Sequence, residues 1–479
     1  MQEQRSTLMR HIAVLAGPVM MAMLTQTIIN QIDHILIGHL PQNEATPGQT
    51  AVQISQIYLW MFGGMLASIA VGTQTLTARR CGERQPEQAG AVATNSLLVS
   101  LVASIVIATL CWLAAPILMK LVNKDETVRA LGIPFLRWRF INIPGMVMFA
   151  ALKAFFDAIG KTWVSLLGAL FMNFMNLILC VVLMYGNENP NIPIIDTLHR
   201  LALTWSGGSL PRLGVSGAGM AAMISSYLGF ATLLVCAIIW ARRPYFIFRL
   251  SNFSWSLARK LVAISIPSGL ATLFGMSGFA FVIFVVGKVD KLAGHGPGQT
   301  IFSTATSNII NVLLLVFMSC IGFATATATL VSQQLGAKRQ HVAKRYVHLS
   351  LLMGLVFYGC LGVVMFVFAP QILRFWNPGD MRVLAIATPI LRVLCCMMPC
   401  FVIAIVFTQA LYGAGNTRFV MVVELVLHFF CLIPLCYALA IWFHLGIWGA
   451  WAALILYVAL LAGTMFLKFR SGTWQHIQL

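Results

Sequence analysis

Charge is scarce in this sequence, and acidic charge is the scarcest. Only 9% of the 479 residues are charged, and 13 acidic residues stand against 31 basic ones. Soluble domains carry roughly a quarter charged residues, whereas 59% of this chain is hydrophobic, so the composition predicts a polytopic protein of the lipid bilayer. The net charge of +18 does not indicate nucleic acid as a partner, because the basic residues form short clusters between apolar runs.

The motifs of common enzyme and cofactor sites are also missing. The 11 cysteines are scattered through apolar segments without a CxxC pair, which excludes the usual zinc and disulfide frameworks. No HExxH or GxSxG motif occurs. The stretch "IGKT" (159–162) is similar to the end of a phosphate-binding loop, but Phe155 stands where that loop needs glycine. We therefore expect neither an enzyme nor a bound cofactor.

Long apolar runs are what the chain has instead. The loops on one side, together with both termini, hold 18 Lys and Arg residues, and the loops on the other side hold nine. Because cytoplasmic loops carry the basic excess, we expect both termini in the cytoplasm. The N-terminus shows no signal-peptide cleavage site and is interpreted as the start of the first span. The twelve expected spans are residues 11–40, 53–79, 91–119, 130–158, 163–186, 214–241, 258–288, 301–335, 346–370, 383–413, 419–443 and 446–467.

The chain contains two copies of a unit of six spans. "PFLRWRFINIP" (134–144) matches "PILRVLCCMMP" (389–399), and "DAIGKT" (157–162) matches "YGAGNT" (412–417), both at an offset of 255. "LGVSGA" (213–218) matches "LGIWGA" (445–450) at 232, because the first half carries an insertion at about 187–212. The sequence thus predicts an all-α integral membrane protein of twelve transmembrane helices. Its expected parts are an N-terminal lobe (1–241), a cytoplasmic loop (242–257) and a C-terminal lobe (258–479), related by an axis along the membrane normal.

One acid lies deep inside an apolar segment. Asp33 is the only Asp, Glu, Lys or Arg between Arg10 and Glu44, and a carboxylate facing lipid costs several kcal/mol. Gln26, Asn30 and Asp33 fall at i, i+4 and i+7, so they share one helix face, which must point away from lipid. The matching positions of the second half hold no polar side chain, and this asymmetry favours a functional role over a structural one: Gly275, Phe279 and Val282.

Two further groups of polar residues accompany it. On the fifth segment Asn173, Asn176 and Cys180 share a face and are candidate partners of Asp33. On the eleventh, Glu424 and His428 lie four residues apart, and His428 is the repeat counterpart of Asn173. This second pair is either a further protonation site, a counter-charge for substrate, or a neutralised pair between packed helices.

These features together resemble the multidrug and toxic-compound extrusion (MATE) family, within the wider group that includes polysaccharide and lipid flippases. The resemblance rests on Pro18 fifteen residues before Asp33, and on "GERQPEQA", "LRWRFINIP" through "AIGKT", "NFMNLILCVVLMYG" and "LGVSGAGMAAMIS". It covers essentially the whole chain. It implies two six-helix lobes around a central cleft, and ion-driven export of organic, often cationic, compounds. The alternative within the wider group is a flippase for a lipid-linked saccharide or lipid, which should line its cleft with basic residues.

The resemblance also implies which residues couple the ion to transport. It implies a first-lobe cation site at Asp33 and Asn176, with Asn30 and Asn173 in the same network, a helix bend at Pro18 and Gln26 near the substrate cleft. Cys180 stands where many members have a second aspartate, and Ala222 where some have threonine. Na⁺ prefers several oxygen ligands, so Na⁺ at Asp33 and Asn176 is possible, but a proton requires only one carboxylate removed from water and is favoured. We expect a monomer in the bacterial inner membrane.

Overall fold

The computed structural model describes residues 2–122, 125–188, 196, 200, 212–241, 243–294, 301–376 and 381–477, and all regular structure in this part of the chain is helical. Most of the insertion expected at 187–212 lies outside the described residues. The first half forms α1 (Gln2–Gly38), α2 (Gln42–Tyr58), η1 (Leu59–Gly64), α3 (Met65–Ala67), α4 (Ile69–Gly82), α5 (Pro86–Val122), α6 (Glu126–Ala158), α7 (Thr162–Tyr185) and α9 (Gly214–Trp240).

The second half repeats this pattern after the short 3-10 turn η2 (Leu250–Asn252). Its elements are α10 (Trp255–Leu292), α11 (Ile301–Gly336), α12 (Gln340–Val367), α13 (Ala369–Trp376), α14 (Met381–Cys396), α15 (Met398–Gly413), α16 (Thr417–Val426), η3 (Leu427–Leu432), α17 (Ile433–Tyr437), η4 (Ala438–Trp442), α18 (Gly446–Arg470) and η5 (Thr473–His476).

The twelve expected membrane spans are confirmed. Within the described residues, 11 helices are long and apolar enough to cross a membrane, and α14 with α15 forms one more span that bends by 55°. The bend was not predicted. Pro399 in the first turn of α15 permits it, because proline has no N–H to donate to the carbonyl four residues earlier. Two other spans continue through π-helical turns: Glu44–Gly82 contains η1, and Thr417–Trp442 contains η3 and η4.

The turns that end corresponding spans have the same backbone geometry in both halves. Gly160 (φ 82°) and Gly415 (φ 85°) adopt the left-handed conformation that glycine favours. The next residue of each turn donates its N–H back to the helix, Lys161 to the Phe156 carbonyl and Asn416 to that of Leu411, both at 2.9 Å. "IGKT" is therefore a helix-terminating turn, as the repeat predicts, and its copy "AGNT" is built in the same way.

Two compact units account for the contacts of the described chain. One contains residues 21–81 and 85–269, and the other contains residues 1–20, 82–84 and 270–479. Each of the two long helices α1 and α10 therefore contributes to both units. The division falls two residues after Pro18 in α1 and two residues after Pro267 in α10, so the repeat-matched prolines occupy equivalent places in the two helices.

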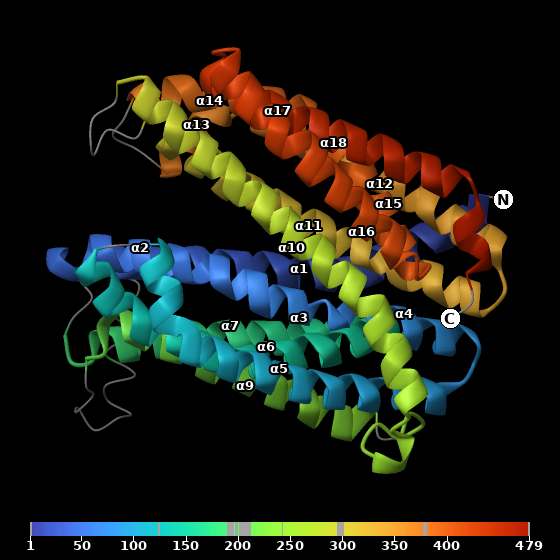
Figure 1. Cartoon of the computed structure of the whole chain (residues 1–479). Coiled ribbons are helices and arrows are strands. Elements are labelled where there is room, and N and C mark those ends of the chain that lie inside the picture. The colour runs from blue at the N-terminus through green and yellow to red at the C-terminus, as the bar shows by residue number, and fades with distance from the viewer. Residues whose placement is uncertain are drawn as a thin grey trace. The chain divides into compact units, whose positions relative to one another are not determined.

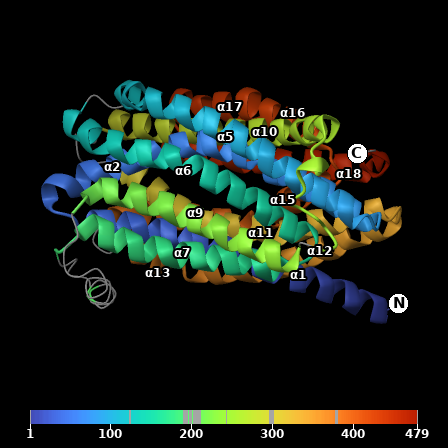
Figure 2. The same ribbon diagram turned by 90° about the horizontal axis from the view of Figure 1, so that it is seen from below.

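In the first unit, α5, α6, α7 and α9 run side by side (Figures 1 and 2), and α9 packs on both α6 and α7. The close approach of α9 to α7 depends on Gly217, where a Cβ would lie 2.4 Å from the carbonyl oxygen of Leu183. Gly449 has the same role in the second half against Leu439. Small residues at such crossings allow close packing, which drives helix association in lipid.

Gly217→Ala is expected to destabilise the unit that carries Asp33. The added methyl group would meet backbone rather than a movable side chain, and overpacking of this kind costs about 1–3 kcal/mol. The apparent melting temperature of the detergent-purified protein should fall by several degrees. Gly463→Ala is the matched control, because nothing lies within 4 Å of a Cβ at that position. Equal melting temperatures for both variants would contradict the packing described here.

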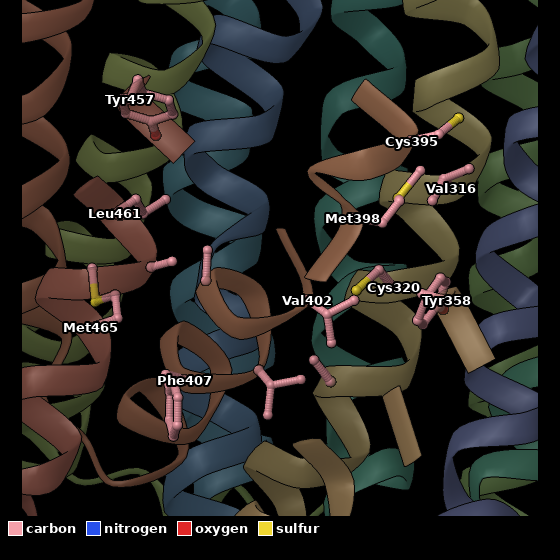
Figure 3. Packing of buried hydrophobic residues seen from close by; sticks show 14 of the residues in the cluster. Val316, Cys320, Tyr358, Cys395, Met398, Val402, Phe407, Tyr457, Leu461 and Met465 are labelled. Atoms are coloured by element: carbon pink, nitrogen blue, oxygen red, sulfur yellow. The ribbon is translucent and has the colours of Figure 1, made fainter. Parts of the chain in front are cut away.

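The second unit has one large apolar core. The helix α15 packs on α11, α12 and α18, so it is surrounded by apolar side chains along its length. Figure 3 shows side chains of this core. Those labelled are Val316 and Cys320 of α11, Tyr358 of α12, Cys395 of α14, Met398, Val402 and Phe407 of α15, and Tyr457, Leu461 and Met465 of α18.

Candidate functional site

Two hydrogen bonds connect α1 and α7, the helices of the first unit that carry the predicted polar side chains. Near one end of the contact Asn173 Nδ2 donates to Thr25 Oγ1 at 3.1 Å, and near the other the Tyr185 hydroxyl donates to the Leu36 carbonyl at 2.7 Å. Asp33 lies on α1 between these two contacts. Its side chain is partly buried, so the carboxylate faces protein from a helix long and apolar enough to span a membrane.

Asn176 of α7 is the direct partner of Asp33. With its amide nitrogen turned toward the carboxylate, the orientation that satisfies both groups, Asn176 donates to Oδ1 at 3.2 Å and to Oδ2 at 3.3 Å. The other end of the amide lies 3.4 Å from the Ser225 hydroxyl of α9, which itself donates to the Ala222 carbonyl at 3.0 Å. Asn176 and Ser225 are both buried. The site is therefore a three-helix seam of α1, α7 and α9.

Two further groups act on the carboxylate. The thiol of Cys180, which is fully buried on α7, lies beside Asp33 and donates a hydrogen bond to Met184 Sδ at 3.1 Å. The guanidinium of Arg139 on α6 acts on Asp33 through its charge. Arg139 donates to Gln56 Oε1 at 3.3 Å, and its Nε has no hydrogen-bond partner among the described residues. A positive charge thus accompanies the acid, and the formal charges of Arg139 and Asp33 sum to zero.

The other predicted residues of the stripe do not join this network. Asn30 is partly buried and Gln26 is exposed, and neither has a hydrogen bond to Asp33 among the described residues. Asn173 is buried, but its partner is Thr25. The structure thus brings together Asp33, Asn176 and Cys180.

Arg139 and Ser225 are site residues that the sequence analysis missed. Arg139 lies in the motif "LRWRFINIP", and its repeat counterpart is Leu394, so it shows the same asymmetry between halves as Asp33. Ser225 follows Ala222 by three residues and shares its helix face. Both signals were present in the sequence.

The predicted pair in the second half is also in contact. Glu424 Oε2 lies 3.2 Å from His428 Nδ1 and accepts a hydrogen bond from the Tyr457 hydroxyl at 2.8 Å. The two side chains are 14% and 4% exposed, respectively. Tyr457, which the sequence analysis did not identify, comes from α18.

Comparison with known protein families gives one match in each half of the chain. A family model described as MatE matches residues 18–182 and 267–438, which is more than half of the chain. The chain belongs to the MatE family. This MatE protein is therefore a multi-pass membrane transporter of small molecules with ion coupling, and not an enzyme. The family resemblance and the fold class inferred from the sequence are confirmed.

Individual relatives are more distant. A probable multidrug resistance protein NorM of Geobacillus kaustophilus is 24% identical over 373 residues, covering 77% of this chain and 74% of that protein. A probable NorM of Thermotoga maritima is 20% identical and covers 87% of this chain and 82% of its own. Among solved structures, an outward-facing multidrug resistance MATE transporter of the MOP superfamily superposes with a TM-score of 0.83, at 18% identity, over 98% of this chain and 97% of its own. At that identity the superposition shows the shared fold.

Proposed function

We propose that this MatE protein exports hydrophobic organic cations from the cytoplasm in exchange for protons, and that Asp33 is the group that carries the proton. The observation that supports this most strongly is the carboxylate of Asp33, which lies in a spanning helix and accepts hydrogen bonds from Asn176. The relatives described as multidrug resistance proteins support the class of cargo.

The surroundings of Asp33 favour a proton over Na⁺. A sodium ion needs several oxygen ligands, but Asn176 presents its amide nitrogen to the carboxylate and Cys180 presents sulfur. Arg139 adds a positive charge that repels a bound metal ion. Protonation, in contrast, needs only the carboxylate itself.

The proposed cycle exchanges one cation for another at this acid. In the outward-open state Asp33 accepts a proton, its attraction for the cationic cargo is lost, and the cargo is released. In the inward-open state the proton leaves to the cytoplasm, and the ionised carboxylate again attracts cargo. A difference of one pH unit is worth about 1.4 kcal/mol, which supports roughly a tenfold gradient of a monovalent cation.

Several features of the proposal concern the chain as a whole. We place both termini in the cytoplasm of a bacterial inner membrane, with lobes 1–241 and 258–479 joined by the loop 242–257, in a monomer. The basic excess of one set of loops supports this orientation. Pro18 lies inside α1 and breaks its hydrogen-bond ladder, so we place the bend that accompanies protonation of Asp33 there.

Ethidium transport into proteoliposomes tests the proposal. The purified protein is reconstituted, and ethidium accumulation is followed by fluorescence with either an interior-acidic pH gradient or an outward sodium gradient, each imposed alone. We expect accumulation with the pH gradient and none with the sodium gradient. Accumulation driven by sodium alone would contradict proton coupling, and accumulation driven by neither gradient would contradict export of organic cations.

Arg139→Gln is expected to tighten ethidium binding. If the ionised Asp33 attracts the cation, the nearby guanidinium opposes it; at about 10 Å and an effective dielectric constant of about 20, its loss should strengthen binding roughly tenfold. The measurement is calorimetric titration of the purified protein at alkaline pH. Arg137→Gln is the matched control, because Arg137 lies two residues away and stacks over Trp112 at 4.6 Å. Equal affinities in the two variants would show that Arg139 does not act on the site.

A further inference from the structure

A second polar cluster is buried in the other compact unit, and the cycle at Asp33 does not use it. It consists of Glu424 on α16, His428 on η3 and Tyr457 on α18. Glu424 Oε2 accepts from the Tyr457 hydroxyl at 2.8 Å and lies 3.2 Å from His428 Nδ1. The rings of His428 and Tyr457 are 4.6 Å apart. An acid buried in this way needs a compensating function or partner in a spanning helix.

The neighbouring helix α10 leaves space for the imidazole of His428. A Cβ at Gly278 would lie 2.3 Å from His428 Cδ2, so only glycine allows the ring to occupy this position. A Cβ at Gly275 would lie 3.9 Å from Nε2. Because glycine has no side chain, residue 275 does not cover this side of the ring. The π-helical turn that contains His428 is a feature often found at functional sites.

The cluster lies on helices that are the repeat equivalents of those that form the Asp33 seam. In the first half, α1 carries the acid and α7 carries its amide partner Asn176. In the second half, α10 is the counterpart of α1 and has lost the polar stripe, whereas α16 and η3, the counterparts of α7, carry both the acid and its partner. His428 itself replaces Asn173. Each half therefore has one acid between corresponding helices. In the first half the acid lies on α1, and in the second half it lies on α16, the counterpart of α7.

The hydrogen bonds define where a proton can be added. His428 Nδ1 faces two acceptors, the Glu424 backbone carbonyl at 2.8 Å and Oε2 at 3.2 Å, so Nδ1 carries a hydrogen in either charge state. The other ring nitrogen is Nε2, which lies on the side of Gly275. A proton that binds Nε2 forms an imidazolium beside the Glu424 carboxylate, and the pair then has no net charge.

No other charge neutralises this pair among the described residues. Tyr412 of α15 is the remaining titratable group that acts on Glu424, and Tyr457 faces it from α18. The cations on the helices packed nearby have other partners: Lys468 lies over the ring of Phe419 at 4.9 Å, and Lys288 donates to the Tyr437 hydroxyl at 2.8 Å. The charge of Glu424 is therefore compensated by hydrogen bonds until a proton arrives.

We propose that Glu424 and His428 form a second proton-binding site, which binds and releases one proton in each transport cycle in addition to the proton at Asp33. This inference rests on the proposed function of the chain as a proton antiporter. The proton forms an N–H bond at His428 Nε2 and leaves by breaking that bond, and nothing is oxidised or reduced. Two protons then exchange for one monovalent cation, so each cycle moves one net charge.

The response of ethidium transport to membrane potential distinguishes exchange for two protons from exchange for one. With equal pH on both sides, an interior-positive potential opposes passive entry of ethidium into proteoliposomes and drives entry only if more than one proton leaves per ethidium. At about 60 mV the expected accumulation is tenfold for two protons and none for one. An interior-acidic gradient of one pH unit, without potential, should give about hundredfold accumulation for two protons and tenfold for one.

The variants are designed so that loss of folding cannot imitate the result. Glu424→Gln and His428→Asn, which introduces the residue of the first half, should each lose the response to potential and keep the response to pH. Glu87→Gln, an exposed acid outside the cluster, should behave as wild type. If either cluster variant fails to fold, the other variant and the wild-type stoichiometry still decide the question.

Three results would overturn the inference. The first is a wild type that responds to pH but not to potential, which means one proton per cycle. The second is a Glu424→Gln variant with the wild-type response to potential. The third is a variant with weaker ethidium binding and unchanged stoichiometry, which would assign Glu424 to the substrate. If the wild type responds to neither driving force, the proposed function itself fails.

Discussion

Replacing Asp33 by asparagine is expected to abolish proton-driven accumulation of ethidium. Asparagine has nearly the size of aspartate and can still bond to the Asn176 amide, so the α1–α7 seam should be kept while the exchangeable proton is lost. Because cargo competes with a proton only at the Asp33 carboxylate in this proposal, the second proton at His428 cannot drive exchange by itself. The initial rate under a pH gradient should fall by a factor on the order of a hundred, to that of protein-free vesicles.

The comparison for Asp33→Asn is the exposed-acid variant Glu87→Gln, which removes one carboxylate elsewhere. Both variants should have the same chromatographic profile and melting temperature as wild type, so that lost transport reports lost coupling. An Asp33→Asn protein that accumulates ethidium as well as wild type, on either gradient, would show that the transported ion binds elsewhere.

Exchanging Cys180 for aspartate is expected to introduce sodium coupling. The Cys180 thiol lies beside the Asp33 carboxylate, so an aspartate at this position would add two oxygens near it. The charges support the same outcome. Asp33 and Arg139 nearly cancel in the wild type, and a second carboxylate leaves one net negative charge for Na⁺ to neutralise. Accumulation of ethidium driven by an outward sodium gradient should rise from background to roughly tenfold.

The matched comparison is Cys180→Asn, which is similar in size and polarity but uncharged. It should remain insensitive to sodium. If the two variants respond equally to the sodium gradient, or if neither responds while both fold, then the thiol at this position is not what excludes sodium, and the argument from ligand chemistry is wrong.

Sequence patterns predicted the helices well because hydropathy and repetition report directly on membrane burial. The twelve spans, the doubled unit and the "IGKT" turn all followed from residue type and spacing. The bend between α14 and α15 did not, although Pro399 was visible, because its repeat counterpart Pro144 lies inside the continuous helix α6. A proline permits a break, and the packing around it decides whether the helix bends.

The site was predictable only in part, because spacing gives the residues on one face but not the direction of that face. The spacing on the fifth span placed Asn173, Asn176 and Cys180 on one face. Along α1, however, this face contacts different residues: Asn173 contacts Thr25, and Asn176 contacts Asp33. Arg137 and Arg139 lie about 200° apart on a helix, and the sequence does not say which one turns inward. The packing of α6 brings Arg139 to the acid.

The most direct test of proton exchange at Asp33 is the number of protons released when ethidium binds. Purified protein in weakly buffered detergent solution is mixed with ethidium, and a pH-sensitive dye reports the released protons. Wild type should release protons on binding, and Asp33→Asn should release about one fewer per ethidium bound, with the difference vanishing at alkaline pH where the carboxylate is already ionised. Identical proton release from the two proteins at every pH would contradict the assignment of Asp33 as the exchanging group.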